Sequence, residues 1–417
     1  MAQDVFPPRG MRDFLPVEKR KRDQVLGVIR ATYLAHGYQE IETPALEDLA
    51  RLTSGQGGDN EKLAYRVMKR GAELDASLET VSGGADANEL ADLGLRFDLT
   101  VPLTRYYATN RAKLPNVFKA IQTGPVWRAE RPQKGRYRQF VQCDIDIIGD
   151  ASSLAEIDLL VSSLDALTGL GLDDAVIRVN HRQLLAELLD SFGVAEADRS
   201  SAMIIIDKLD KIASDGVIRE MTERFGDAVG AKVTAWLASG AANSGDVPEI
   251  LAPIFSAVES RFAGRLRFDA TLVRGMGYYT GPIFEIEHPA SGASIGGGGR
   301  YDGMVGRWLG QDVPAVGISI GFERVIDLVG DLSMHGAPNL LVLVLDNDAP
   351  ATLANAIARQ SELHEHGYSV RLENRPKKLN NLLDNLAENG FTHFATVDEE
   401  SVTFESLNIR VIGASLN

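Results

Sequence analysis

The chain has 417 residues, of which 44% are hydrophobic and 24% are charged, and its formal net charge at pH 7 is −15. This length predicts two or three domains, because single hydrophobic cores stop growing at about 250–300 residues. The acidic excess argues against nonspecific adhesion to nucleic acid, so we expect no DNA partner, although a local basic surface is still compatible with RNA binding.

Membrane, secreted and metal-binding classes are also disfavoured. No run reaches the roughly 18 apolar residues of a membrane span, and residues 1–16 lack the apolar segment of a secretory signal. Cys143 is the single cysteine, which excludes an intramolecular disulfide, and the seven histidines show no metal-ligand spacing. We therefore expect a cytoplasmic protein that has no protein-bound metal and no membrane contact.

The first hundred residues predict a helix followed by strands and a loop. Apolar residues at helical spacing predict a helix over 17–36 that Gly37 ends, and residues 38–44 alternate like a short strand. Little periodicity marks 71–94, which we interpret as a loop. Residues 95–102 alternate again and predict a strand with Asp98 and Thr100 on one face. Such a pair can bind an ammonium group, and an exposed strand edge has the same pattern.

A central hairpin is predicted from two strands, 118–130 and 139–147. On the second strand Gln142, Asp144 and Asp146 fall two residues apart and therefore point to one face. Guanidinium groups match phosphate oxygens in bidentate geometry, so the hairpin suits a phosphate-bearing ligand. An exposed hairpin with a charged tip is equally compatible with the pattern. The connecting loop carries four basic residues: Arg131, Lys134, Arg136 and Arg138.

The second half of the chain predicts a helical block and then mixed structure. Residues 181–263 are mostly helical in pattern, and His181, at a helix start, favours a structural hydrogen bond over a catalytic role. The glycine run 296–299 lacks the spacing of a dinucleotide fingerprint or a P-loop. It allows a backbone to approach a ligand closely, and a flexible turn fits equally well. Residues 338–417 alternate between strands and helices as an α/β module, joined at 332–338.

Taken together, these segments resemble the signature motifs of class II histidyl-tRNA synthetases. Residues 128–140 resemble motif 2, residues 17–44 motif 1 and residues 315–324 motif 3. The runs LVRGMGYY (272–279) and GGGRYD (297–302) resemble the two signatures that distinguish the histidine enzymes. The first run departs from the family at Met276-Gly277, where Leu-Asp is more usual, and so lacks a carboxylate beside the site.

The resemblance implies an α+β fold with three parts. An antiparallel class II sheet flanked by helices is expected from residues 1–180 and 264–331. A helical insertion is expected at 181–263, and a C-terminal α/β domain similar to anticodon-binding domains at 338–417. That last domain is shorter and less basic than usual, so its anticodon contact is the least supported of these implications.

The activity implied by the resemblance is ATP-dependent activation of L-histidine, followed by transfer to the 3′ end of tRNA(His), with Mg²⁺ and in a homodimer. Arg274 and Arg128 are the implied catalytic residues. The implied histidine-binding residues are Asp98, Leu99, Thr100, Gln142, Asp146, Tyr278 and Tyr279. The implied ATP-binding residues are Arg128, Glu130, Arg136, Phe140 and Arg324.

Two other interpretations belong to different classes. One is the catalytically silent paralogue that acts as regulatory subunit of ATP phosphoribosyltransferase in histidine biosynthesis, and the other is a degenerate synthetase-like RNA-binding protein. The paralogue typically lacks the C-terminal module and parts of the arginine-bearing motifs. This chain has the module and retains Arg128, Arg274 and Arg324, which favours the enzyme.

Overall fold

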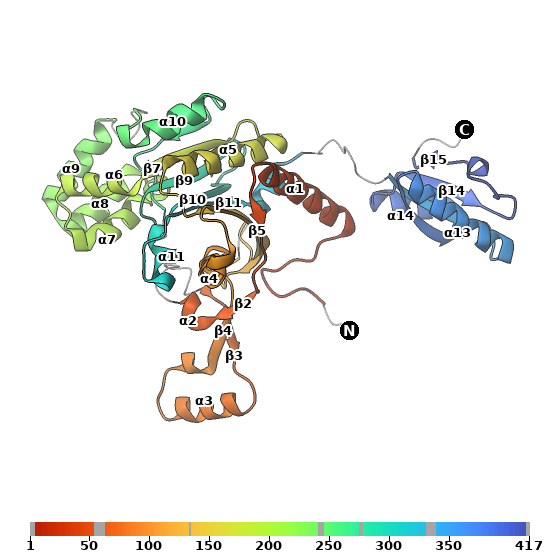
Figure 1. Ribbon diagram of the computed structural model, residues 1–417, viewed down its shortest axis with the longest axis horizontal. Coiled ribbons are helices and arrows are strands. Elements are labelled where there is room, and N and C mark those ends of the chain that lie inside the picture. Colours follow the sequence, from red (N-terminus) through yellow and green to blue (C-terminus); the bar gives the residue numbers. More distant parts are fainter. Residues whose placement is uncertain are drawn as a thin grey trace. The chain divides into compact units, whose positions relative to one another are not determined.

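The computed structural model describes residues 5–53, 63–132, 135–240, 246–274, 278–330 and 339–413, without the side chains of 210–211 (Figure 1). The chain divides into two compact units. The first comprises Met1–Asp13 and Gln24–Gly330, and the second Phe14–Asp23 and Asp331–Asn417. Lys134, the Met276-Gly277 pair and the junction 332–338 lie outside the described residues.

An eight-stranded sheet forms the centre of the first unit, and it confirms the predicted α+β class. Neighbouring strands are antiparallel except for the first and last pairs, which are parallel. In spatial order the strands are β1 (Gln39–Glu40), β5 (Phe118–Trp127), β6 (Gln139–Ile148), β11 (Ala315–Gly321), β10 (Gly296–Arg300), β9 (Pro282–Glu287), β7 (Val176–His181) and β8 (Leu266–Phe268).

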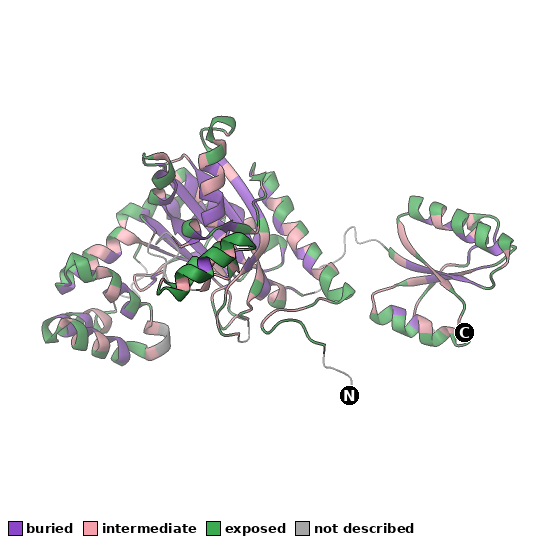
Figure 2. Ribbon diagram, turned by 90° about the horizontal axis from the view of Figure 1, so that it is seen from below, coloured by how far each residue is buried: buried purple, intermediate pink, exposed green. Residues whose placement is uncertain are grey.

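Alternation of side chains along β6 separates an apolar face from a polar one, as predicted. Cys143, Ile145 and Ile147 are buried on the face covered by helix α5 (Ser153–Gly169), which packs against β6 and β11. The opposite face carries the polar residues of the strand. Figure 2 shows the sheet as mostly buried and the helices around it as exposed on their outer sides. Further helices of this unit are α1 (Pro16–Ala35, which continues from the second unit), α2 (Leu49–Leu52), α4 (Thr100–Asn110), α11 (Asp302–Leu309) and α12 (Phe322–Leu328).

The loop predicted over 71–94 is wrong. Helix α3 (Ala72–Ser82), a 3-10 turn (Ala87–Leu90) and strand β4 (Ala91–Leu95) occupy it, and β4 pairs with β2 (Leu46–Asp48) and β3 (Arg66–Met68). Figure 1 shows α3 at the far end of this hairpin, away from the main sheet. Because α3 is largely exposed and buries only Ser77, it needs no apolar stripe, and the residue preferences of Ala, Leu and Glu suffice.

Two other predicted segments also differ. The strand expected over 95–102 is wrong, because β4 ends at Leu95 and helix α4 begins at Thr100. Asp98 accepts a 3.1 Å hydrogen bond from the Val101 N–H, so its carboxylate occupies a helix start. The glycine run is not a turn but strand β10, paired on both sides with β9 and β11. Four glycines show no alternation of apolar and polar side chains, so the sequence pattern does not indicate this strand, which is defined by backbone pairing alone.

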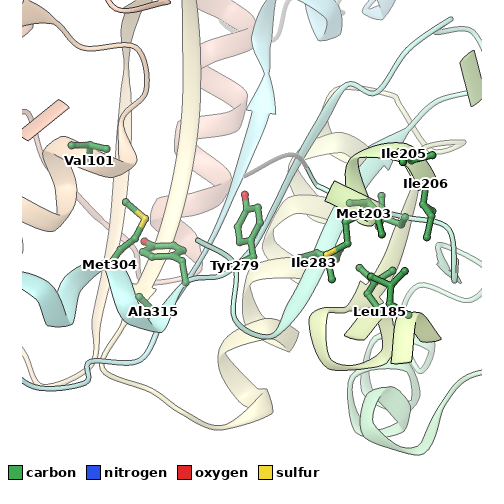
Figure 3. Close-up of a cluster of buried hydrophobic side chains, with 14 of the residues drawn as sticks. Val101, Leu185, Met203, Ile205, Ile206, Tyr279, Ile283, Met304 and Ala315 are labelled. Atoms are coloured by element: carbon green, nitrogen blue, oxygen red, sulfur yellow. The ribbon is translucent and has the colours of Figure 1, made fainter. Parts of the chain in front are cut away.

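Helices α6 (Arg182–Phe192), α7 (Arg199–Ile206), α8 (Leu209–Phe225), α9 (Asp227–Ala238) and α10 (Ala252–Glu259) belong to the first unit. One cluster of buried side chains runs from the sheet into this block, through Ile283, Leu185 and Met203 (Figure 3). His181 has the structural role predicted for it, since its ring accepts a 3.1 Å bond from the Gln183 N–H at the start of α6. The unit's other 3-10 turns are Arg111–Lys113, Glu196–Asp198 and Glu249–Leu251.

The second unit is a four-stranded sheet with helices packed on it. Alternate residues of its central strand enter two separate clusters, Leu341, Leu343 and Leu345 in one and Val342 and Val344 in the other. No helix in the described part of the chain is long and apolar enough to span a membrane. In spatial order the strands are β13 (Tyr368–Asn374), β12 (Asn339–Leu345), β14 (His393–Val397) and β15 (Arg410–Val411), with helices α13 (Pro350–Glu365) and α14 (Leu379–Glu388) and the 3-10 turn Phe404–Ser406.

Candidate functional site

A cavity of about 450 Å³ lies on the polar face of the central strands. It brings together every predicted site residue except Leu99, whose side chain is buried and whose carbonyl accepts a 3.0 Å bond from Gln122. The predicted residues that line it are Asp98, Thr100, Arg128, Glu130, Arg136, Phe140, Gln142, Asp146, Arg274, Tyr278, Tyr279 and Arg324.

The register of the strands explains why glycines form the floor of this cavity. Asp146 on β6 lies opposite Gly317 on β11, where a Cβ would be 1.9 Å from the Asp146 carboxylate. Gly297 on β10 lies opposite Glu285 on β9, where a Cβ would be 2.8 Å from the Arg274 guanidinium. Glycine at both positions therefore leaves the space that the charged groups occupy.

Arg274 is held from behind by a network of charged residues. Its Nη1 donates a 2.9 Å bond to Glu285, and Arg178 donates a 3.2 Å bond to the other oxygen of the same carboxylate. Arg178 is held in turn by Asp269, at 2.7 Å from its Nε. Burial opposes the charge of Arg274, but Tyr279 and Glu285 raise its pKa. The guanidinium thus stays charged and fixed in direction.

Two further arginines line the cavity, and Arg324 lies at its end nearer the basic loop, where a Cβ on Gly135 would be 3.8 Å from the Arg324 Nε. Arg128 donates a 3.0 Å bond to the Phe97 carbonyl, and its guanidinium carbon is 5.0 Å from the Phe140 ring centroid. Arg324 donates to the Ser294 carbonyl. Burial lowers the pKa of both, and the neighbouring Arg136 lowers that of Arg324 further. Cations whose charge is disfavoured by burial, and in Arg324 also by Arg136, provide a site for an anion.

The other end of the cavity is acidic. Asp146 accepts a 2.5 Å bond from the Tyr301 hydroxyl, and burial raises its pKa to about 7. Burial, and then the charge of Asp146, raise the pKa of Asp144 well above its usual range. The side-chain oxygen of Gln142 is buried without a hydrogen-bond partner in the described residues. These groups are suited to accept hydrogen bonds from a cationic or N–H-bearing ligand.

Tyrosines form one wall of the acidic end. The rings of Tyr278 and Tyr279 meet edge to face at 4.7 Å between centroids, and Tyr278 is 6.2 Å from Tyr301. Burial raises the pKa of Tyr278 well above its usual range, so its hydroxyl keeps its proton. The cavity therefore combines cations suited to an anion with acidic groups suited to a cation, and Arg128 and Arg274 also line it.

Sequence reasoning missed several residues of the site: Arg178, Glu285, Ser319, Tyr301 and Glu323. The available signal was the alternation of Glu285 and Glu287 along a strand beside the tyrosine signature. For Arg178 no local pattern existed, because its partners Asp269 and Glu285 lie about a hundred residues further along the chain.

Comparisons with known proteins point in one direction. A family model described as "Histidyl-tRNA synthetase" matches residues 10–325. The chain is 51% identical to the histidine–tRNA ligase of Leifsonia xyli subsp. xyli, over 96% of this chain and 97% of that one. It is 41% identical to a probable histidine–tRNA ligase of Tropheryma whipplei, over 94% and 96% of the two chains.

Solved structures show the same likeness. The crystal structure of histidyl-tRNA synthetase from Nostoc sp. PCC 7120 superposes with a TM-score of 0.75 and 25% identity, over 99% of this chain and 97% of that one. A Bacillus halodurans structure, described as an ATP phosphoribosyltransferase regulatory subunit/histidyl-tRNA synthetase, gives 0.74 at 19% identity, over 92% and 97% of the chains. At that identity the second likeness shows the fold alone.

Proposed function

Because the chain belongs to the histidyl-tRNA synthetase family, we propose that it is a histidine–tRNA ligase, which activates L-histidine with ATP and transfers it to tRNA(His). The observation that carries the proposal is a single cavity lined by Arg128, Arg274 and Arg324 together with carboxylates such as Asp98 and Asp146. The arginines offer the charge that the phosphates of a nucleoside triphosphate require, and the carboxylates offer the charge that the ammonium group of an amino acid requires.

In the activation step a carboxylate oxygen of histidine attacks the α-phosphorus of ATP. The bond from that phosphorus to the bridging oxygen breaks, and pyrophosphate leaves with the electron pair. Both reactants are anions and charge grows on the phosphoryl oxygens, so fixed cations do most of the catalysis. Arg128 binds the α-phosphate, Arg324 the γ-phosphate end, and Arg274 bridges the carboxylate and the α-phosphate.

Arg274 suits that role because it is already oriented. Its bond to Glu285, and the bond from Arg178 to the same carboxylate, hold the guanidinium before any substrate arrives. A preoriented cation stabilises the developing charge without a cost of reorganisation during the reaction. Glu285 and Arg178 are therefore positioning residues for Arg274.

We assign the adenine base and the metal ion to the same part of the cavity as the phosphates. Glu130 and Phe140 bind the adenine, and Arg136, 3.6 Å from Glu130, lies beside the phosphates. Mg²⁺ enters with the triphosphate as part of the substrate. Magnesium usually binds through phosphates and one or two carboxylates, and the described residues gather no cluster of three metal-binding side chains.

Histidine occupies the acidic end. Asp98 and Thr100 bind its α-ammonium group together with the side-chain oxygen of Gln142. Leu99 joins the first two residues in the chain, and Tyr279 lines the same cavity. Asp146 and Tyr278 bind the two imidazole nitrogens. A site built to hydrogen-bond a polar side chain rejects analogues that lack it by about 10⁴–10⁵, without an editing step.

Transfer to tRNA involves surfaces outside the cavity. The basic residues of the loop 131–138 meet the acceptor end, and residues 338–417 approach the anticodon. Residues 17–44 resemble motif 1, which supports a homodimer, and the division into a core (1–180 and 264–331) with an insertion (181–263) follows the family. A cytoplasmic location fits an enzyme of protein synthesis.

Histidine-dependent exchange of pyrophosphate into ATP tests the activity. Arg274→Ala should lower the exchange rate by about 10²–10³, the usual loss for a transition-state cation. Arg267→Ala is the matched control, because Arg267 is half exposed and pairs with Glu287. A folded wild-type chain with no exchange at all would overturn the proposal and favour the regulatory-subunit alternative.

A further inference from the structure

Residues 9–12, which no step above uses, cross the basic loop. The Arg138 N–H donates a 2.8 Å hydrogen bond to the Gly10 carbonyl, and the Arg138 guanidinium is 3.4 Å from the Arg9 carbonyl. Gly10 lies against both ends of the loop: a Cβ there would be 2.7 Å from Pro132 and 2.9 Å from Arg138. Its φ of +84° also favours glycine.

Arg12 connects three parts of the nucleotide end of the cavity. Its guanidinium carbon lies 3.5 Å from the ring centroid of Tyr137 in the loop. The same guanidinium forms an ion pair with Glu323, the residue before Arg324. The side chain of Glu323 is only 6% exposed. The other oxygen of Glu323 accepts a 3.2 Å bond from the Val141 N–H of β6. Tyr137, Val141 and Glu323 all line the cavity.

These contacts have a consequence for binding. Tyr137 follows Arg136, and Glu323 precedes Arg324, so the two residues that Arg12 touches are chain neighbours of two ATP-binding arginines. A planar guanidinium can stack on a ring while its edge donates to a carboxylate, and lysine cannot do both. Arg12 therefore fixes the spacing between loop and helix α12.

We propose that residues 9–12 form a strap that holds the basic loop in its ATP-binding arrangement, with Arg12 as a positioning residue. This inference rests on the proposed function in one respect, since ATP must bind between the loop and α12. The strap itself is a feature of the folded chain, and amide hydrogen exchange can detect it without any measurement of activity.

Kinetics of pyrophosphate exchange provide the first test. Arg12→Ala should raise the KM for ATP about tenfold and leave the KM for histidine within about twofold, because the strap touches only the nucleotide end. Arg12→Lys should give an intermediate value. Arg9→Ala should match the wild type, because Arg9 contributes its carbonyl and not its exposed side chain. An unchanged KM for ATP in Arg12→Ala, or equal rises for both substrates, would overturn the strap.

Amide hydrogen exchange gives the second test, which needs no activity. Arg12→Ala should speed exchange at the Arg138 and Val141 N–H groups. The Arg138 N–H donates to the Gly10 carbonyl of the strap, and the Val141 N–H donates to Glu323, which Arg12 holds. Gly10→Ala should do the same at Arg138 without altering Arg12. If the wild type lacked pyrophosphate exchange, the proposed function would fail, yet unchanged amide rates in both variants would separately refute the strap.

Discussion

Asp146 illustrates how a single residue of this site is tuned against stability. It is 4% exposed, and burial raises its pKa from 3.8 to about 7, although the Tyr301 hydroxyl opposes the shift. Between these values the folded chain holds a proton that the unfolded chain has released. The free energy of unfolding therefore falls, on account of this group, as pH rises from about 4 to about 7.

Asp146→Asn should remove that loss. The variant has no proton to release, so part of its gain in unfolding free energy over the wild type is already present at pH 5. The gain should grow by a further 2–3 kcal/mol, roughly, between pH 5 and pH 8. Urea unfolding at the two pH values measures the difference. A gain of the same size at both would mean that Asp146 does not titrate in this window.

The polar face of β6 and the residue Arg178 show the limit of sequence reasoning at this scale. Gln142, Asp144 and Asp146 were predictable as one face of a strand, because side chains alternate along any strand. Arg178 was not, because its role depends on Asp269 and Glu285, which reach it through strands far along the chain.

Strand β10 (Gly296–Arg300) shows how an element can be defined by its neighbours. At Gly298 an added Cβ would be 1.9 Å from the Gly317 carbonyl oxygen and 2.7 Å from the Ile318 Cα. Both are backbone atoms of β11, so they cannot rotate away. The close approach of β10 and β11 thus requires glycine, and the same approach forms the cavity floor.

Gly298→Ala should therefore destabilise the protein by about 3 kcal/mol, at the upper end of overpacking costs. Gly303→Ala is the matched control in helix α11, because nothing lies within 4 Å of its added Cβ. It should stabilise by about 0.5–1 kcal/mol, the helical preference of Ala over Gly. Urea denaturation of both variants measures these changes, and a neutral Gly298→Ala would refute the close approach.

Charge is the property that matters at the scale of the whole molecule. With a net charge of −15 the protein repels tRNA at long range. We therefore propose that productive contact comes from local cations such as Arg131, Arg136 and Arg138, within the roughly 8–10 Å over which charges act in salt.

Charging of tRNA should consequently weaken more steeply with salt than adenylate formation does. Each phosphate contact releases counterions, so affinity falls with rising salt in proportion to the number of contacts. Histidine-dependent pyrophosphate exchange in the same potassium chloride series is the control, since it needs no tRNA. Parallel salt curves for the two reactions would count against a basic RNA surface on the loop.

The sequence by itself determined the family resemblance, the α+β class, the hairpin of β5 and β6 and most cavity residues. These follow from local periodicity and from motifs whose side chains are adjacent in the chain. Tertiary structure decided what local pattern cannot encode. It paired residues 91–95 as strand β4 with β2 and β3, and it turned the glycine run into a strand. It also placed Arg12 on Tyr137 and Arg178 on Glu285. The physical reason is that these outcomes depend on pairing partners distant in the chain, and the residues adjacent to a given position do not specify those partners.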